Sequence, residues 1–282
     1  MKKGLVLEGG AMRGMFTCGV IDVMMENSID FDGIIGVSAG AAFGCNYKSK
    51  QIGRGIRYNM RFCNDKRYCG LHSLITTGNL FNAEFCYQTV PTQYDIFDDK
   101  TFYENPMEFI AVCTDIETGK PYYKSFVKKE ENMFEWFRAS ASLPLVSKIV
   151  EINGLKLLDG GIVDSIPIRH MEEIGYEKNI VVLTQPQNYV KKKNNAMPLI
   201  KAVFRKYPEF VKAIGNRHNM YNETLEYIKE REESGSIFVI RPDEPLAIGR
   251  MEKDPQNLKR VYEIGRKTAL ENLDKIFKYL KD

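Results

Sequence analysis

The chain has 282 residues, of which 44% are apolar and 27% are charged, as is ordinary for a globular protein. No apolar run approaches the roughly 18 residues of a membrane-spanning helix, and the short apolar stretch near the start does not make a signal peptide. Six scattered cysteines form no C-x-x-C pair and only three histidines are present, so we expect no metal site and no cofactor. These features predict a cytoplasmic protein.

The net charge of +3 is unevenly distributed along the chain. Residues 191–217 contain eight Lys and Arg but one acid, Glu209, and carry an apolar stripe from Leu199 to Ile214 that we expect to kink near Pro208. This segment suits a peripheral contact with an anionic membrane, and a surface helix packed on the core is the alternative. No nucleic-acid-binding motif accompanies it, so we expect no nucleic-acid partner.

The first forty residues predict a β-α-β unit. Residues 5–7 read as a buried strand, residues 8–14 as a loop, residues 15–24 as a helix with one apolar face, and residues 30–35 as a second strand. A crossover of this length predicts a parallel sheet with helices on both faces.

Helical and strand patterns continue to the end of the chain. In order, the sequence predicts mainly helix over 41–103, a strand pair at 109–114 and 122–126, a helix at 131–140, a hairpin of 149–152 and 155–158 around Asn153-Gly154, strands at 180–184 and 237–240, and a final helix over 255–280. No linker is evident. We therefore expect a single domain over residues 1–282, with a catalytic core of about 1–187 and a helical C-terminal extension of about 188–282.

Residues 36–40 read Gly-Val-Ser-Ala-Gly, where the second predicted strand gives way to a helix of small residues. On a tight strand-to-helix turn the Ser38 hydroxyl is pushed out of the backbone, and Gly36 and Gly40 let the turn close without a Cβ clash. The N–H groups at the helix start can hold a developing oxyanion. The pattern favours Ser38 as a nucleophile, with a plain turn as the alternative.

A glycine-rich loop precedes the first helix and consists of Gly9, Gly10, Ala11, Met12, Arg13 and Gly14. Its N–H groups can converge into an anion-binding nest, and Arg13 adds a positive charge. A dinucleotide-binding turn is the alternative. However, Ala11 replaces the middle glycine of G-x-G-x-x-G, and neither Asp30 nor Asp32 clearly ends the second strand.

Asp159-Gly160-Gly161 follows the strand predicted at 155–158. An aspartate at a strand end can reach the sheet edge where the Ser38 turn lies, and the glycines allow a sharp turn that points its carboxylate at the serine. A generic Asp-Gly turn is the alternative. None of His72, His170 and His218 occupies a strand-end turn that follows the Ser38 turn in Ser-Asp-His order with supporting sequence, so we expect all three to be structural or exposed.

Taken together, Gly-Gly-Ala-Met-Arg-Gly, Gly-Val-Ser-Ala-Gly and Asp-Gly-Gly resemble the patatin-like phospholipase family. Residues 139–144 and 114–119 are similar to further segments of such proteins, and 242–267 resembles the tail of one bacterial branch, so the resemblance covers nearly the whole chain. One departure is Ala11, where the family has a third glycine; alanine keeps the N–H but disfavours a positive φ.

The resemblance implies a three-layer α/β/α fold with a mostly parallel sheet and a Ser–Asp dyad without histidine. Ser38 is then the nucleophile, Asp159 the base, and the loop of residues 9–14 the oxyanion hole. The expected activity is hydrolysis of an acyl lipid or ester through an acyl-enzyme, with phospholipase A, lysophospholipase or carboxylesterase substrates. An acyltransferase or thioesterase with the same dyad, or a non-catalytic lipid- or nucleotide-binding module, remains the alternative.

Overall fold

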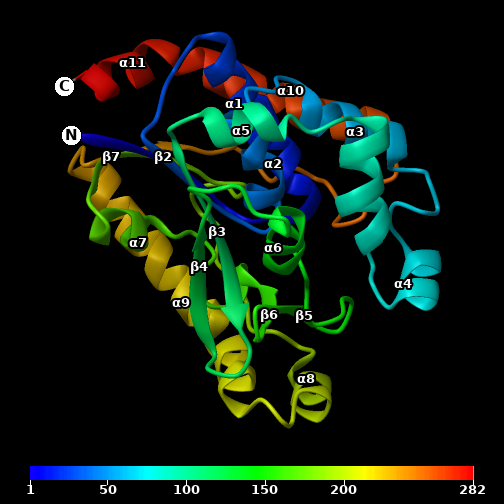
Figure 1. Cartoon of the computed structure of the whole chain (residues 1–282). Helices are drawn as coiled ribbons and strands as arrows, with labels where there is room; N and C mark the ends of the chain where they lie inside the picture. Colours follow the sequence, from blue (N-terminus) through cyan, green and yellow to red (C-terminus); the bar gives the residue numbers. More distant parts are fainter. Residues whose placement is uncertain (282) are drawn as a thin grey trace.

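The computed structural model describes residues 1–281, which build one eight-stranded sheet between two layers of helices (Figure 1). The strands are β1 (Lys2–Leu7), β2 (Gly33–Val37), β3 (Glu108–Asp115), β4 (Lys120–Ser125), β5 (Val150–Ile152), β6 (Leu155–Asp159), β7 (Tyr176–Val182) and β8 (Ile237–Ile240). Their order is β5-β6-β3-β2-β1-β7-β8, with β4 also paired to β3. Neighbouring strands in the series β3-β2-β1-β7-β8 pair in parallel. The pairings of β4 and β6 with β3, and of β5 with β6, are antiparallel, so the sheet is mostly parallel and the predicted fold class is confirmed.

Helices occupy both faces of this sheet. They are α1 (Gly14–Glu26), α2 (Ala39–Lys48), α3 (Arg54–Phe62), α4 (Leu71–Thr77), α5 (Asp99–Glu104), α6 (Met133–Ser140), α7 (Ile168–Glu173), α8 (Met197–Val203), α9 (Pro208–Glu233), α10 (Pro255–Glu271) and α11 (Leu273–Lys281), with 3-10 turns η1 (Ala11–Arg13) and η3 (Gly160–Ile162) and a π-helix η2 (Phe85–Tyr94). Nowhere in residues 1–281 does a helix have the length and apolar character that crossing a bilayer requires.

The two faces of the sheet follow from the alternation of side chains along each strand. In β1, Leu5 and Leu7 join the core under α1, α2 and α10, whereas Val6 joins the core under α7 and α9. Figure 1 shows α1 and α10 on one side of the strands and α7 and α9 on the other. Every one of these three side chains is fully buried, as expected for a central strand of a parallel sheet.

Two glycines allow helix α10 to pack closely against α1. A Cβ at Gly19 of α1 would lie 2.1 Å from the carbonyl oxygen of Tyr262, and a Cβ at Gly265 of α10 would lie 2.0 Å from that of Phe16. The helix backbones therefore touch, and any larger residue at either position would push them apart. This contact joins the C-terminal part of the chain to the first β-α-β unit.

Several predicted boundaries were wrong in an informative way. The expected kink near Pro208 is a complete break between α8 and α9, because proline has no N–H to donate and holds Tyr207 out of the helical region, at φ −125° and ψ 69°. The predicted final helix is likewise two helices, α10 and α11, which meet at Asn272. The Asn153-Gly154 hairpin was predicted correctly, and both residues have the positive φ of a type I′ turn.

Candidate active site

Ser38 lies between β2 and α2 with φ 54° and ψ −119°, a conformation that non-glycine residues rarely adopt. The flanking glycines are required by close backbone contacts. A Cβ at Gly36 would lie 2.4 Å from the carbonyl oxygen of Gly40, and a Cβ at Gly40 would lie 2.3 Å from that of Leu7 in β1. The turn is therefore compressed against the central strand, and the Ser38 side chain, which is partly exposed, borders two cavities.

A buried serine of α6 holds this turn in place. The Ser38 N–H donates to Ser140 Oγ at 2.9 Å, and Ser140 Oγ donates in turn to the carbonyl oxygen of Val112 in β3 at 2.6 Å. Ser140 is fully buried, so the hydrogen bonds are shielded from water. In the sequence, Ser140 lies within a segment that resembles the family, but no role was predicted for it. Because Ser140 and Ser38 are far apart along the chain, no local pattern indicates their contact.

The glycine-rich loop brings backbone N–H groups to the same place. Gly9, Gly10 and Ala11 line a cavity with Ser38, and within residues 1–281 their N–H groups donate no hydrogen bond. Ala11 does adopt the positive φ that alanine disfavours, at 48°, and the N–H of Arg13 closes the turn onto the Gly10 carbonyl at 3.1 Å. Unpaired N–H groups beside a serine hydroxyl are suited to hold an oxyanion.

Two other residues of the predicted loop have different places. The Arg13 side chain lines the cavity, with Nε 3.4 Å from Thr184 Oγ1. Gly14 does not line it: this residue begins α1 beneath the Phe43 ring, where a Cβ would lie 2.7 Å from a ring carbon. Gly14 therefore serves packing between α1 and α2 in this structure.

Asp159 ends β6 and lines the same cavity as Ser38. Its backbone is fixed on both sides, since its N–H donates to the Ser142 carbonyl at 2.8 Å and its carbonyl accepts from Thr114 Oγ1 at 2.7 Å. One carboxylate oxygen, Oδ1, accepts from the Gly161 N–H at 2.8 Å. The other, Oδ2, is buried and has no hydrogen-bond partner in the described part of the chain. Gly160 allows the turn, because a Cβ there would lie 2.2 Å from the Val112 carbonyl oxygen.

The environment makes Asp159 a stronger base than an ordinary carboxylate. Burial raises the pKa of Asp159, and the positive charge of Arg217, the nearby Ser38 hydroxyl, the Gly161 N–H and Arg250 oppose this rise only in part. The nearby Ser38 hydroxyl lowers the pKa of Asp159, although it donates no hydrogen bond to Oδ2 in this structure. A carboxylate with a raised pKa and an open oxygen near a serine is equipped to accept its proton.

The histidines lie apart from this pair. His72 is exposed on α4, and His170 stacks on Tyr123 with ring centroids 3.5 Å apart. His218 lines a neighbouring cavity with Lys192 and Lys193, and none of the three borders the two cavities that open at Ser38. The structure thus brings Ser38, Asp159 and the glycine-rich loop together without a histidine among them.

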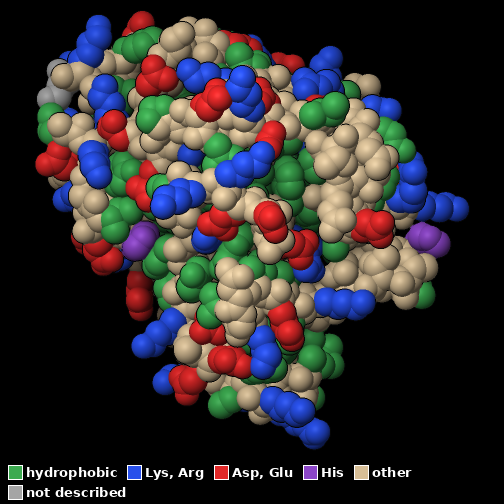
Figure 2. Space-filling view, viewed as in Figure 1, with side chains coloured by type: hydrophobic (Ala, Val, Ile, Leu, Met, Phe, Trp, Pro, Cys, Tyr) green, Lys and Arg blue, Asp and Glu red, His purple; other side chains and the backbone are tan. Residues whose placement is uncertain are grey.

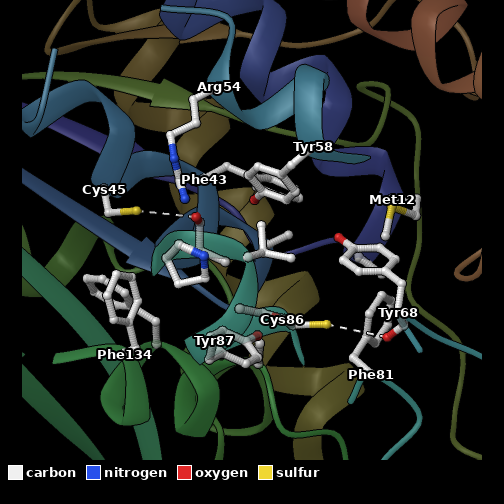
Figure 3. Close-up of a pocket in the computed structure, with 18 of the residues that line it drawn as sticks. Met12, Phe43, Cys45, Arg54, Tyr58, Tyr68, Phe81, Cys86, Tyr87 and Phe134 are labelled. Carbon is white, nitrogen blue, oxygen red and sulfur yellow. Dashed lines mark hydrogen bonds between the residues drawn. The ribbon is translucent and has the colours of Figure 1, made fainter. Parts of the chain in front are cut away.

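On one side of Ser38 lies an apolar cavity (Figure 3). Aromatic side chains from α2, α3, η2 and α6 surround it, and Figure 3 shows Phe43, Tyr58, Tyr87 and Phe134 facing the space from different directions. The cavity has about 840 Å³ of empty space, part of which is open to solvent. Its lining is suited to a hydrocarbon chain.

On the other side of Ser38 lies a polar cavity, to which the C-terminal part of the chain contributes Lys191, Arg217, Tyr221 and Arg250. Arg217 Nε donates to the Gly161 carbonyl at 2.5 Å, and Tyr221 donates to the buried Glu8 carboxylate at 2.6 Å. The sequence analysis missed these residues as parts of the site. The excess of Lys and Arg in residues 191–217 is visible in the sequence, but the pattern does not show which of these side chains line the cavity.

A family model described as patatin-like phospholipase matches residues 5–171, and a domain of unknown function, DUF6363, matches residues 207–281. The chain belongs to the patatin-like phospholipase family, a class of lipid-hydrolysing enzymes, as its three motifs predicted. Both motif residues Ser38 and Asp159 lie inside the first match, whereas Arg217, Tyr221 and Arg250 lie inside the second.

Individual proteins and one solved structure are also similar to this chain. The uncharacterized protein YjjU of Escherichia coli (strain K12) is 26% identical over 273 residues, spanning 93% of this chain and 74% of that protein. Lysophospholipase nte1 of Aspergillus terreus is 30% identical over 185 residues, which span 61% of this chain but only 11% of the fungal protein. Among solved structures, VipD from Legionella pneumophila is similar over 97% of this chain and 67% of its own, with 13% identity and a TM-score of 0.45.

Proposed function

We propose that this protein is a serine acyl hydrolase that cleaves the ester of an acyl lipid with a Ser38–Asp159 dyad. The observation that carries the proposal is the single cavity that holds the Ser38 hydroxyl, the buried Asp159 carboxylate and the free N–H groups of Gly9, Gly10 and Ala11. Family membership and the lysophospholipase relatives support lipid hydrolysis as the reaction class.

In the proposed mechanism each group has a defined role. Asp159 accepts the Ser38 proton while Ser38 Oγ attacks the ester carbonyl carbon, and the loop N–H groups bind the oxygen that becomes negative. The tetrahedral intermediate collapses to an acyl-enzyme as the lipid alcohol leaves with the proton held by Asp159. Water then attacks the acyl carbonyl carbon while Asp159 takes a proton from it, and Asp159 returns this proton to Ser38 Oγ as the bond between Ser38 and the acyl group breaks and the fatty acid is released.

Substitution of the dyad tests this mechanism. We expect Ser38→Ala to abolish hydrolysis of p-nitrophenyl butyrate, and Asp159→Asn to lower kcat by about 10²- to 10⁴-fold, because an amide cannot accept the serine proton. Both variants should retain the circular dichroism spectrum of the wild type. Near-normal turnover of folded Asp159→Asn would remove this residue from the mechanism.

We also propose that the end of the molecule around α8 contacts anionic membrane. Leu199 and Val203 of α8 are more than half exposed, and the exposed cations Lys201, Arg205 and Lys206 stand beside them. Figure 2 shows Lys and Arg side chains, with Asp and Glu side chains among them, at the end of the molecule that carries α8 in Figure 1. Apolar side chains between cations are typical of a surface that rests on lipid headgroups. Such a contact would bring the enzyme to its substrate.

A further inference from the structure

The polar cavity beside Ser38 contains more positive charge than its catalytic groups need. Four cations line it, namely Arg13, Lys191, Arg217 and Arg250, and they face two carboxylates, Glu8 and Asp159. Both carboxylates are buried; both oxygens of Glu8 accept hydrogen bonds, from Tyr221 and Thr184, whereas Asp159 accepts from the Gly161 N–H through Oδ1 alone. None of the four cations forms an ion pair with a carboxylate anywhere in residues 1–281.

Two of these cations, Lys191 and Arg217, are partly desolvated at the cavity, and the positive charges there act on one another. Burial, with smaller contributions from the charges of Arg217, Arg13 and Arg250, lowers the pKa of Lys191 to about 8 against the opposing effect of Glu8. Burial also lowers the pKa of Arg217, and Arg250 again adds to the decrease. Lys191 Nζ rests 4.3 Å from the centre of the Tyr221 ring, which fixes the ammonium at the cavity rather than in solvent.

The two cavities at Ser38 share Ala11, Ser38 and Leu143, so they adjoin each other at the nucleophile. A substrate whose ester lies at Ser38 would place its hydrocarbon chain among the aromatic side chains and its alcohol portion among the cations. In a phospholipid the alcohol portion carries a phosphate a few bonds from the ester. The direction of the substrate through the site follows from this separation of apolar and positive linings.

We propose that Arg13, Lys191, Arg217 and Arg250 form a subsite for the phosphate of a glycerophospholipid headgroup, and that three of these residues come from the chain beyond the patatin-like match. The inference rests on the proposed function, because it concerns the alcohol part of the substrate that is released when Ser38 is acylated. Arginine and lysine bind phosphate oxygens through charge-assisted hydrogen bonds, and no neutral glyceride can use them. The subsite therefore selects phosphate-bearing esters over neutral ones, and net-negative headgroups over zwitterionic ones.

Soluble short-chain substrates separate this subsite from attraction of the whole protein to a charged surface. The three substrates are hexanoyl glycerol, hexanoyl glycerophosphocholine and hexanoyl glycerol phosphate, each used below its critical micelle concentration. For the wild type we expect kcat/KM to be about 10- to 100-fold higher for hexanoyl glycerol phosphate than for hexanoyl glycerol, with the choline ester between them. The Lys191→Met, Arg250→Gln double variant should reduce this ratio at least tenfold.

Matched variants exclude indirect effects. Lys191→Arg with Arg250→Lys preserves both charges and should keep most of the ratio, and Lys212→Met removes an 81% exposed cation of α9 that lines neither cavity and should leave the ratio as in the wild type. A wild-type ratio near one, or a ratio that survives the double neutralisation, would overturn the subsite even if Ser38-dependent hydrolysis is intact. Absence of Ser38-dependent hydrolysis of all three esters would instead overturn the proposed function.

Inhibition by inorganic phosphate distinguishes a subsite for a lipid headgroup from a site for free phosphate. If the subsite serves the headgroup, phosphate should inhibit hydrolysis of hexanoyl glycerol phosphate competitively and only weakly, because it lacks the acyl chain. Strong stabilisation of the wild type by inorganic phosphate, with no rate advantage for the phosphate ester, would show a free-phosphate site and contradict the proposal.

Discussion

Two residues in the candidate active site, Ser38 and Ala11, have a positive φ although neither is glycine. Such conformations typically cost about 1–3 kcal/mol each and persist where the surroundings hold them. Ser38 is held by Ser140 and by the close packing of Gly36 and Gly40, and Ala11 by the turn that Arg13 closes on Gly10. Both lie beside one cavity, so the strained positions coincide with the groups to which we assign attack and oxyanion binding.

The raised pKa of Asp159 predicts the acidic side of the pH profile. The base works only when ionised, so kcat/KM should fall as pH falls through its pKa, at a pH above the ordinary aspartate value of about 4. Arg217 holds this pKa down, so Arg217→Gln should move the acidic limb to higher pH whatever it does to the maximum rate. Lys212→Met should leave the limb in place. An unmoved limb, or one moved to lower pH in Arg217→Gln, would contradict the role of Asp159 as base.

At the scale of elements, the sequence predicted the parts that depend on local pattern. The β1-α1-β2 unit, the Asn153-Gly154 hairpin and the strand before Asp159 follow from apolar spacing and turn residues, and the structure contains all of them. Positions where a helix stops were predicted poorly. The apolar stripe runs across Pro208 without interruption, so periodicity gave one helix where the backbone makes two.

Only the site residues that belong to sequence motifs could be predicted from the sequence. Ser38, Asp159 and the loop of residues 9–14 are marked by glycines whose spacing is visible in one chain. Arg217 and Tyr221 stand one turn apart on α9, and their inward direction is set by how α9 lies against η3 and β1. The packing of α9 against η3 and against Glu8, which follows β1, is a tertiary property, so no local pattern distinguishes these side chains from the exposed Lys212.

The contact between α1 and α10 gives a prediction for elements. Gly265→Ala should lower the free energy of unfolding by about 1–3 kcal/mol, because its Cβ would meet the Phe16 carbonyl at 2.0 Å and force the helices apart. Gly215→Ala is the matched control within α9. Its nearest neighbour is a flexible Met197 carbon at 3.5 Å, so it should be neutral or stabilising. Urea denaturation of both variants measures the difference, and equal stabilities would contradict this close contact.

At the scale of the whole molecule, the basic side chains of the C-terminal part of the chain lie in two separate places. Lys191, Arg217 and Arg250 face the cavity at Ser38, whereas Lys201, Arg205 and Lys206 stand on the surface around α8. The basic stretch of residues 191–217 is therefore divided between the cavity at Ser38 and an exposed surface. Lys191, at the start of that stretch, belongs to the cavity.

The surface part predicts membrane binding that depends on salt. Sedimentation with vesicles of phosphatidylglycerol and phosphatidylcholine should show binding that weakens between 50 and about 500 mM salt, because screening reduces attraction between exposed charges. Lys201→Glu with Lys206→Glu should weaken binding strongly at low salt, and Lys259→Glu with Lys267→Glu on α10 serves as the charge-matched control. Binding that ignores both salt and the α8 substitutions would count against this contact.

The central claim is that Ser38 becomes acylated with Asp159 as its base, and trapping the covalent enzyme tests it most directly. A fluorophosphonate probe is incubated with wild type, Ser38→Ala and Asp159→Asn, and the modified peptide is located by tandem mass spectrometry. The account predicts one label per wild-type chain, on Ser38, no label on Ser38→Ala, and labelling of Asp159→Asn slowed by at least about 100-fold. A label on another residue, or equal labelling of wild type and Ser38→Ala, would contradict it.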